Sequence, residues 1–263
     1  MSFFTVEALS AGYGGKHILR DASFRVEAGS LVGILGVNGS GKTTLLKSVC
    51  GILPHTGSCM LEDERLEGLT PRHLARLCSY IPQRSGIAID ISALDVVLMG
   101  WNPQLGLLER PTRQMREKAM EMLAEVGLSG KEHTNYLHLS EGQKQLCILA
   151  RTLVAGSKLL LLDEPESALD FHFRYHLLHL LRQWVAQRER AAIVTLHDPM
   201  LALNRCDQLL ILSGGRVESV LYRGTEDLEV LEKALSGLYG SVSLQRCENR
   251  RGQPQLVMLK EEP

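Results

Sequence analysis

The residues best suited to chemistry form one glycine-rich stretch, Gly36-Val37-Asn38-Gly39-Ser40-Gly41-Lys42-Thr43. Its spacing, G-x-x-x-x-G-K-T, is that of a P-loop, whose backbone amides surround a phosphate. Glycines let those amides approach the anion without a Cβ clash, and the helix that follows offers unpaired N–H groups. Lys42 would reach the terminal phosphates, and the Thr43 hydroxyl would bind Mg²⁺. The stretch therefore predicts binding of a nucleoside triphosphate.

A pair of carboxylates, Asp163 and Glu164, directly follows the apolar run Leu159–Leu162. Such a run is typical of a strand buried on both faces, so the carboxylates would lie where that strand emerges. Asp163 is then suited to hold Mg²⁺ opposite Thr43, and Glu164 to activate or orient the attacking water. A solvated turn is the alternative interpretation of this pair.

Two further polar residues follow predicted strands. Gln83 comes after the strand Cys78–Ile81, and His197 after the strand 191–196. The Gln83 amide is neutral and could contact both metal and water, while His197 could donate a hydrogen bond to the γ-phosphate. Each residue alone would be read as an ordinary loop residue. Only their places in the order of the other motifs give them a predicted catalytic role.

The elements that must position these residues are strands and helices in alternation. The apolar run Leu31–Leu35 predicts a strand before the P-loop, and residues 44–50 predict a helix after it. Further strands are predicted at 3–9, 18–26 and 57–61, and a closing hairpin is predicted at 208–221. Predicted helices begin after capping residues at Thr70, Ser92, Thr112 and Ser140. Residues 227–238 and 254–259 predict a last helix and a last strand.

The composition argues against several classes of partner. The chain of 263 residues has 29 basic and 30 acidic side chains and only 5% aromatic residues, which disfavours a nucleic-acid partner. The six cysteines show no C-x-x-C pair, so free thiols are expected. We also expect no signal peptide and no transmembrane segment, because no apolar run approaches the roughly 20 residues that a bilayer requires.

The sequence does not assign a role to Tyr13, and it favours an ordinary structural role for three histidines. Tyr13 lies in a predicted loop at 11–15, where core packing, a turn position and a ligand contact are all possible. His172, His176 and His179 have helical spacing that suggests a metal site. Apolar residues gather on the opposite side of that helix, so the polar face of an amphipathic helix is the favoured interpretation.

The order of the motifs resembles that of the ATP-binding cassette (ABC) ATPases over nearly the whole chain. The motifs that carry the resemblance are Tyr13, the P-loop, Gln83, the Ser-x-Gly-Gln signature in 139–143, Asp163-Glu164, the segment 167–170 and His197. The segments 81–83, 96–100 and 196–199, with weaker similarity in the tail, most resemble the ATPases of bacterial importers for ferric siderophores, haem and cobalamin.

The resemblance implies a fold and a domain organisation. The expected fold is α/β, a RecA-like P-loop NTPase with a parallel-sheet core, an antiparallel β flank and an inserted helical subdomain. All 263 residues would form a single ABC ATPase domain. Its expected parts are a nucleotide-binding core at 1–83 and 151–222, the helical subdomain at 84–150 and a C-terminal extension at 223–263.

The resemblance also implies a homodimer in which two nucleotides lie between subunits of opposite orientation. Ser140 and Gly142 would reach the γ-phosphate bound to the other subunit, Asp170 would cross the interface, and Tyr13 would stack on adenine. The expected nucleotide-binding residues are Tyr13, Gly36, Asn38, Gly39, Ser40, Gly41, Lys42, Thr43, Thr44, Ser140, Gly142, Gln143 and Asp170. The expected catalytic residues are Lys42, Gln83, Glu164 and His197, with Mg²⁺ held by Thr43, Gln83 and Asp163.

The implied function is ATP hydrolysis that powers uptake of a metal chelate or cobalamin. The expected partners are a transmembrane permease and, indirectly, a substrate-binding protein, with the ATPase bound peripherally at the cytoplasmic face of the bacterial inner membrane. Three alternatives stay open: a soluble ABC ATPase of another function such as iron–sulfur cluster assembly, an importer ATPase for another cargo such as an oxyanion, and a regulatory module without turnover.

Two residues depart from the family pattern. Glu141 stands where the signature usually has glycine, and Glu166 where threonine or serine is usual. A carboxylate beside bound phosphates would repel them, so we expect the Glu141 side chain to face away.

We predict that Glu141→Gly leaves the ATPase rate within a few-fold of wild type, because the backbone contacts of Ser140 and Gly142 do not require residue 141 to point inward. Steady-state ATPase assays of the two proteins test this. A large gain in rate would mean instead that Glu141 restrains closure of the dimer.

Overall fold

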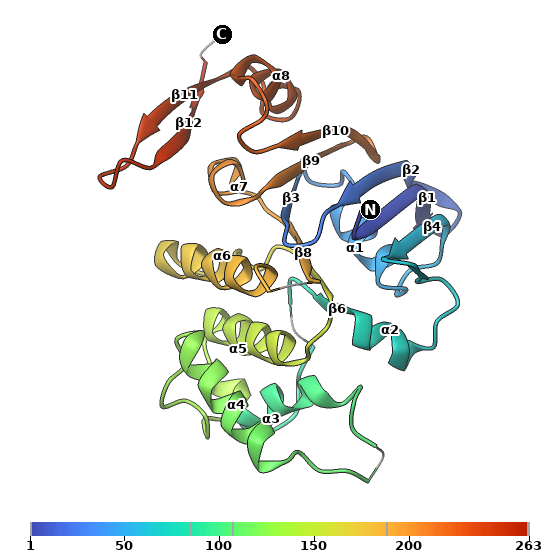
Figure 1. Cartoon of the computed structure of the whole chain (residues 1–263), viewed down its shortest axis with the longest axis vertical. Helices are drawn as coiled ribbons and strands as arrows, with labels where there is room; N and C mark the ends of the chain where they lie inside the picture. Colours follow the sequence, from blue (N-terminus) through green and yellow to red (C-terminus); the bar gives the residue numbers. More distant parts are fainter. Residues whose placement is uncertain (1, 85, 107, 188, 262–263) are drawn as a thin grey trace.

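The computed structural model describes residues 2–84, 86–106, 108–187 and 189–261. Its centre is a six-stranded sheet with the strand order β10-β9-β3-β8-β7-β6 (Figure 1). Five of these strands run parallel, and β10 pairs antiparallel with β9 at one edge. The strands are β3 Leu31–Leu35, β6 Cys78–Ile81, β7 Leu159–Leu162, β8 Ala191–Thr195, β9 Gln208–Ser213 and β10 Arg216–Tyr222. The predicted parallel-sheet core is confirmed.

The burial of strand β7 on both faces explains why its sequence is a continuous apolar run. All four of its leucines are fully buried, and alternate side chains enter different cores. Leu160 and Leu162 pack with the core that includes helices α5 (Glu141–Val154) and α6 (Phe171–Val185). Leu159 and Leu161 pack with the core under the antiparallel sheet. A strand covered on both faces has no polar position, as predicted.

The antiparallel flank is a four-stranded sheet in the order β2-β1-β4-β5. Its strands are β1 Phe4–Tyr13, β2 Lys16–Val26, β4 His55–Leu61 and β5 Glu64–Arg65. The predicted loop around Tyr13 is wrong in part, because β1 continues through Tyr13 and only Gly14 and Gly15 form the turn. Both glycines have positive φ, the conformation that a tight hairpin turn needs.

The helices begin where the capping residues predict. The side chains of Thr70, Ser92, Thr112 and Ser140 each accept a backbone N–H of the first turn. The remaining helices are α1 Lys42–Val49, α2 Pro71–Leu77, α3 Ala93–Leu98, η1 Met99–Trp101, α4 Arg113–Glu125, η2 Tyr136–His138, α7 Pro199–Arg205 and α8 Leu228–Tyr239. The predicted boundary at residue 150 lies inside α5, which continues to Val154.

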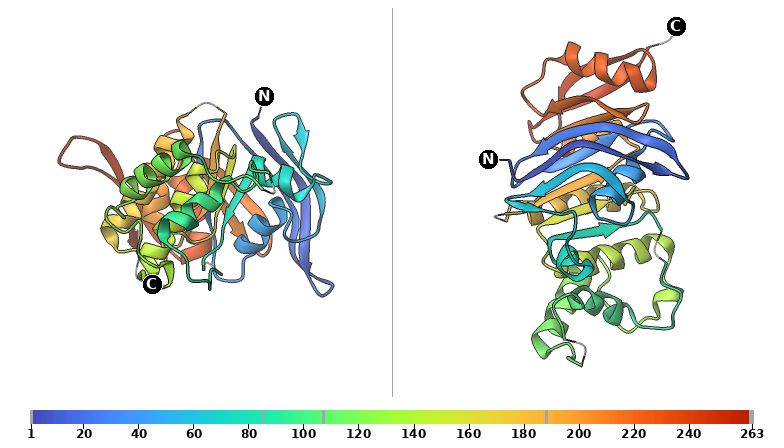
Figure 2. Two further views of the ribbon diagram at one scale, coloured as in Figure 1. Left: turned by 90° about the horizontal axis from the view of Figure 1, so that it is seen from below. Right: turned by 90° about the vertical axis from the view of Figure 1, so that its right-hand side faces the viewer.

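Two segments lie at opposite ends of the long axis. Helices α3, α4 and α5 form one end, and α8 with the hairpin of β11 (Val242–Glu248) and β12 (Pro254–Lys260) forms the other (Figures 1 and 2). Strand β12 confirms the predicted last strand, whereas β11 has no counterpart in the sequence prediction. Its second half is exposed on both faces, so it lacks the alternation that marks a strand.

Two further expectations concern the thiols of the cysteines and the presence of a transmembrane segment. All six cysteines are free thiols, as predicted. None of the helices in the described ranges combines the length and the apolar character that crossing a membrane requires.

Gly100 lies in η1, where its backbone packs closely against α5. A Cβ there would lie 2.3 Å from the Arg151 carbonyl oxygen and 2.8 Å from the Val154 side chain. We expect Gly100→Ala to lower the free energy of unfolding by about 1–3 kcal/mol, because backbone has to move to admit the methyl group. Urea unfolding followed by circular dichroism measures this change.

The control is Gly237→Ala in the exposed last turn of α8, where a Cβ meets no described atom within 4 Å apart from its chain neighbours and its own helix backbone. This change should leave stability unchanged or raise it by up to about 1 kcal/mol, because alanine favours helix over glycine. Equal effects of the two substitutions would contradict the packing argument.

Candidate nucleotide-binding and catalytic site

The P-loop connects the end of β3 to the start of α1, as its sequence requires. Gly39 and Gly41 have φ values of +81° and +106°, which only glycine adopts readily. Gly36 is required for a different reason, because a Cβ there would lie 2.4 Å from the Leu212 carbonyl oxygen. Apart from its chain neighbours, no described atom lies within 4 Å of a Cβ built at Gly39, so the loop is open on that side.

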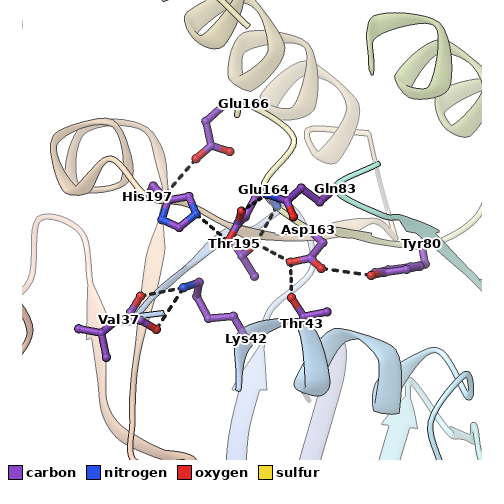
Figure 3. Close-up of polar contacts among 11 residues, drawn as sticks. Val37, Lys42, Thr43, Tyr80, Gln83, Asp163, Glu164, Glu166, Thr195 and His197 are labelled. Atoms are coloured by element: carbon purple, nitrogen blue, oxygen red, sulfur yellow. Dashed lines mark hydrogen bonds and ion pairs between the residues drawn. The ribbon is translucent and has the colours of Figure 1, made fainter. Parts of the chain in front are cut away.

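Lys42 is the first residue of α1 and points back into the loop. Its Nζ donates hydrogen bonds to the carbonyl oxygens of Gly36 (2.8 Å) and Val37 (3.5 Å) (Figure 3). Only 5% of the residue is exposed. Burial lowers the pKa of the ammonium group, although the nearby carboxylates of Glu164 and Asp163 oppose the shift. A buried cation thus lies where the motif predicts a phosphate ligand.

Asp163 is held by hydroxyl groups from three different elements. Its Oδ1 accepts hydrogen bonds from Thr43 of α1 and Thr195 of β8, each at 3.1 Å. Its Oδ2 accepts a hydrogen bond from the Tyr80 hydroxyl at 3.2 Å (Figure 3). Burial and the neighbouring Asp163 charge both raise the pKa of Tyr80, so this phenol remains a hydrogen-bond donor. The carboxylate is buried, yet both of its oxygens accept hydrogen bonds.

Glu164 lies at the centre of the predicted catalytic group. Its Oε2 accepts a hydrogen bond from Gln83 Nε2, and its Oε1 contacts His197 Nε2, both at 2.6 Å (Figure 3). Its backbone has a φ of +49°, which is strained for a residue other than glycine, and its N–H donates to Thr195 Oγ1 at 2.8 Å. The structure therefore brings Gln83, Glu164 and His197 together from three strand ends.

Two residues of this arrangement, Tyr80 and Thr195, have no role predicted from the sequence. Thr195 joins the two carboxylate residues, because its hydroxyl donates to Asp163 while accepting from the Glu164 N–H. The only local signal is a hydroxyl residue at the end of the otherwise apolar strand Ala191–Thr195. Tyr80 has no distinctive signal, since tyrosine is common in strands.

Glu166 has a structural position that its sequence context did not predict. Only 2% of the residue is exposed, and its Oε1 accepts a hydrogen bond from the His197 backbone N–H at 2.9 Å (Figure 3). Its Oε2 is buried and has no hydrogen-bond partner among the described residues. Burial raises the pKa of this carboxyl group. Glu166 thus fixes the backbone that presents His197 to Glu164.

The remaining predicted site residues make local contacts. Ser140 and Gln143 form a capping box, with Ser140 Oγ accepting from the Gln143 N–H at 3.3 Å and Gln143 Oε1 accepting from the Ser140 N–H at 3.1 Å. Asp170 Oδ1 caps α6 by accepting the Phe173 N–H. Tyr13 is 50% exposed at the end of β1. The Glu141 carboxylate is 76% exposed and pairs with Lys144 at 2.8 Å.

Comparison with known proteins identifies the family of this chain. Residues 19–167, more than half of the chain, match the sequence model of the ABC transporter family. This chain belongs to the ABC transporter family. The match includes the P-loop, Gln83, the signature segment and both carboxylates. The protein is therefore an ATP-binding cassette ATPase, as the order of its motifs predicts.

Individual relatives of this ABC ATPase carry transport names. A Helicobacter pylori ATP-binding protein assigned to iron chelatin transport is 34% identical over 236 residues, which cover 89% of this chain and 91% of the relative. The hemin import ATP-binding protein HmuV of Deinococcus radiodurans is 36% identical over 217 residues, or 81% of each chain. A solved transporter assigned to the metal-chelate type, in an inward-facing conformation, matches with a TM-score of 0.79 and 25% identity over 99% of both chains.

The raised pKa of Glu166 predicts a pH-dependent stability. The native carboxyl group holds its proton more tightly than the unfolded one, whose pKa is near 4.5, so it stabilises the fold at low pH. This contribution is lost as the pH rises through the native pKa. Glu166→Gln is neutral at every pH and escapes the loss, so its stability relative to wild type should increase as the pH rises above about 4.5.

Urea unfolding at a series of pH values measures this difference. Glu121→Gln is the matched control, because Glu121 is exposed on α4. Its stability relative to wild type should not rise with pH as that of Glu166→Gln does. A pH-independent difference for Glu166→Gln would show that the carboxyl group has the same pKa in the native and the unfolded state.

Proposed function

We propose that this ABC ATPase is the ATP-hydrolysing subunit of an importer for an iron chelate or haem. The names of its relatives support the cargo class, because two of them are named for iron chelatin transport and hemin import. The match to a transporter of the metal-chelate type, which covers the whole length of both chains, supports the same class. The ATPase would act from the cytoplasmic face of the membrane, together with a transmembrane permease and, indirectly, a substrate-binding protein.

The observation that carries the hydrolytic role is the contact of Glu164 with both Gln83 and His197. A carboxylate held from two sides, beside a loop built for phosphate, is suited to take a proton from the attacking water. Gln83 would orient that water through its neutral amide, and His197 would donate to the γ-phosphate. Phosphoryl transfer depends mainly on such positioning and on charge stabilisation.

The P-loop residues would bind the triphosphate. Backbone amides between Gly36 and Thr44 would surround the phosphates, and the Lys42 ammonium would exchange its carbonyl partners for phosphate oxygens. The exposed ring of Tyr13 offers a surface on which adenine could stack. These roles follow the family pattern residue by residue.

The residues present also fit a magnesium ion. Thr43 Oγ1 and Asp163 Oδ1 lie 3.1 Å apart, and hydroxyl and carboxylate oxygens are the ligands that Mg²⁺ prefers. Thr43, Asp163 and Gln83 would hold the ion directly or through water. When bound, Mg²⁺ would neutralise part of the phosphate charge.

The signature residues would act on a second copy of the chain. The start of α5 presents Ser140, Gly142 and Gln143 at a helix N-terminus, which favours an anion. A Cβ at Gly142 would lie 2.9 Å from the Ala168 carbonyl oxygen, so glycine allows the segment before Asp170 to pack against this helix. In a head-to-tail homodimer, these residues would complete the partner's triphosphate site.

Replacement of the proposed general base tests this function. Glu164→Gln keeps an acceptor oxygen for Gln83 but removes the basic carboxylate. We expect the rate of ATP hydrolysis to fall by about 10²–10⁴-fold, while ATP binding is retained and the protein forms a stable ATP-bound dimer. A phosphate-release assay measures turnover, and light scattering after gel filtration measures the dimer.

The exposed substitution Glu121→Gln is the control and should leave both readings at the wild-type level. Turnover at the wild-type level in Glu164→Gln would exclude Glu164 as the base. Failure of purified wild-type protein, alone and with its permease, to hydrolyse ATP would contradict the transport role and favour a regulatory module.

A further inference from the structure

A second group of chemically active side chains lies outside the nucleotide site. His55 and Cys59 belong to β4, and Glu67 follows β5. One ligand atom from each of the three lies within 4.8 Å of the others. Within the described ranges, this is the only group of three or more His, Cys, Asp or Glu residues whose ligand atoms come this close.

The antiparallel sheet places these three side chains on one side. His55 and Cys59 are four residues apart on β4, so the strand alternation directs both to the same face. The Leu66 N–H donates to the Cys59 carbonyl oxygen at 2.9 Å, and the Cys59 N–H donates to Glu67 Oε1 at 2.7 Å. These hydrogen bonds fix Glu67 opposite Cys59. The arrangement is therefore held by the backbone and not only by contacts among the side chains.

The separations of the three donor atoms are close to those around a metal ion. His55 Nε2 lies 2.9 Å from Glu67 Oε1 and 3.9 Å from Cys59 Sγ. With metal–ligand bonds of about 2.0–2.3 Å, neighbouring donors of a tetrahedral zinc site lie about 3.3–3.8 Å apart. Small rotations of side chains would therefore admit the ion.

The negative charge of the group is that of the Glu67 carboxylate, whose Oε2 also pairs with Arg65 Nε at 3.0 Å. Burial acts to raise the pKa of Glu67, but hydrogen bonds from His55, from Arg65 and from backbone N–H groups outweigh it, and the pKa is lowered. Glu67 is thus ionised at neutral pH. The Cys59 side chain is fully buried, and burial followed by the Glu67 charge raises its thiol pKa. An entering divalent cation would take the place of the thiol proton, which passes to solvent.

A cavity gives access to the group and leaves room for a fourth ligand. Its volume is about 390 Å³, and His55 and Glu67 line it together with Cys50 and Tyr80. A cavity of this size holds water easily. Three protein ligands with one position open to water is a common arrangement for zinc.

We propose that His55, Cys59 and Glu67 bind a divalent transition metal of the zinc class, with water from the cavity as the fourth ligand. Imidazole, thiolate and carboxylate together suit Zn²⁺ or Co²⁺ better than Mg²⁺ or Ca²⁺, which prefer oxygen ligands alone. The bound ion would tie β4 to the segment after β5 and would stabilise the folded protein. The site requires no nucleotide.

Titration of the full-length, chelator-treated protein with Co²⁺ tests the proposal. We expect one equivalent to bind with a thiolate-to-cobalt charge-transfer absorption, and Zn²⁺ to displace it. Cys59→Ser should abolish this absorption. His55→Ala and Glu67→Gln should each weaken Zn²⁺ binding at least about tenfold, since each removes a ligand or its charge.

Two variants control for other metal-binding groups. Cys247→Ser removes the exposed cysteine, and a triple alanine variant at His172, His176 and His179 removes the histidines of α6. Both should bind Co²⁺ as the wild type does. ATP binding and the urea midpoint in the absence of metal show whether each variant is folded.

Three results would overturn the site: no charge-transfer absorption in the wild type, its retention in Cys59→Ser, or its loss in either control variant. Should Cys59→Ser fail to fold, Glu67→Gln decides alone, because its amide oxygen can still accept the Cys59 N–H. Zn²⁺ affinity unchanged in Glu67→Gln would then exclude the proposal.

Discussion

The parallel direction of the strands around β3 is the constraint on which the site depends. Parallel strands end at the same edge of a sheet, so β3, β6, β7 and β8 deliver their following residues to one place. The P-loop, Gln83, the Asp163-Glu164 pair and His197 come from segments far apart in the chain, yet they meet there. The Thr195 hydroxyl then joins the end of β7 to the end of β8 through Asp163 and the Glu164 N–H.

The burial of charge at this edge has a consequence for catalysis. Asp163, Glu166 and Lys42 are each at most 5% exposed, and buried charges are costly unless they are paired or hydrogen-bonded. Hydroxyl groups satisfy Asp163, and loop carbonyls satisfy Lys42. Donors and acceptors that are already fixed in a low-dielectric site need little rearrangement when a charged substrate arrives. Glu166 is the exception, since one of its carboxylate oxygens has no hydrogen-bond partner in the part of the chain that the structure describes.

The proposed metal site and the nucleotide site share a border. Tyr80 lines the cavity beside His55 and Glu67, and its hydroxyl donates to Asp163. Helix α1 begins at Lys42 and ends at Val49, which borders the same cavity. A short helix and one phenol ring thus separate the two groups of residues. Their donor sets differ in kind, because oxygen atoms of Thr43 and Asp163 face each other in the nucleotide site, whereas an imidazole and a thiol join the Glu67 carboxylate in the proposed metal site.

The sequence alone determined the features that local pattern or a motif encodes. The P-loop, the strand before Asp163 and the capping residues are of this kind, because each depends on spacing within a few residues. The family followed from the order of the motifs along the chain. Gln83 and His197 were predicted through their order along the chain.

Only the tertiary structure showed that Tyr80 and Thr195 support Asp163, that Glu166 holds the His197 backbone, and that His55, Cys59 and Glu67 meet. Tyr80 lies 83 residues from Asp163, and Thr195 lies 32 residues from it. Tyr80 and Thr195 are ordinary residue types in ordinary strands, and their contacts follow from strand order and register. Long-range hydrogen bonding of this kind leaves no periodic trace in a single sequence, because it is decided by how the sheets assemble.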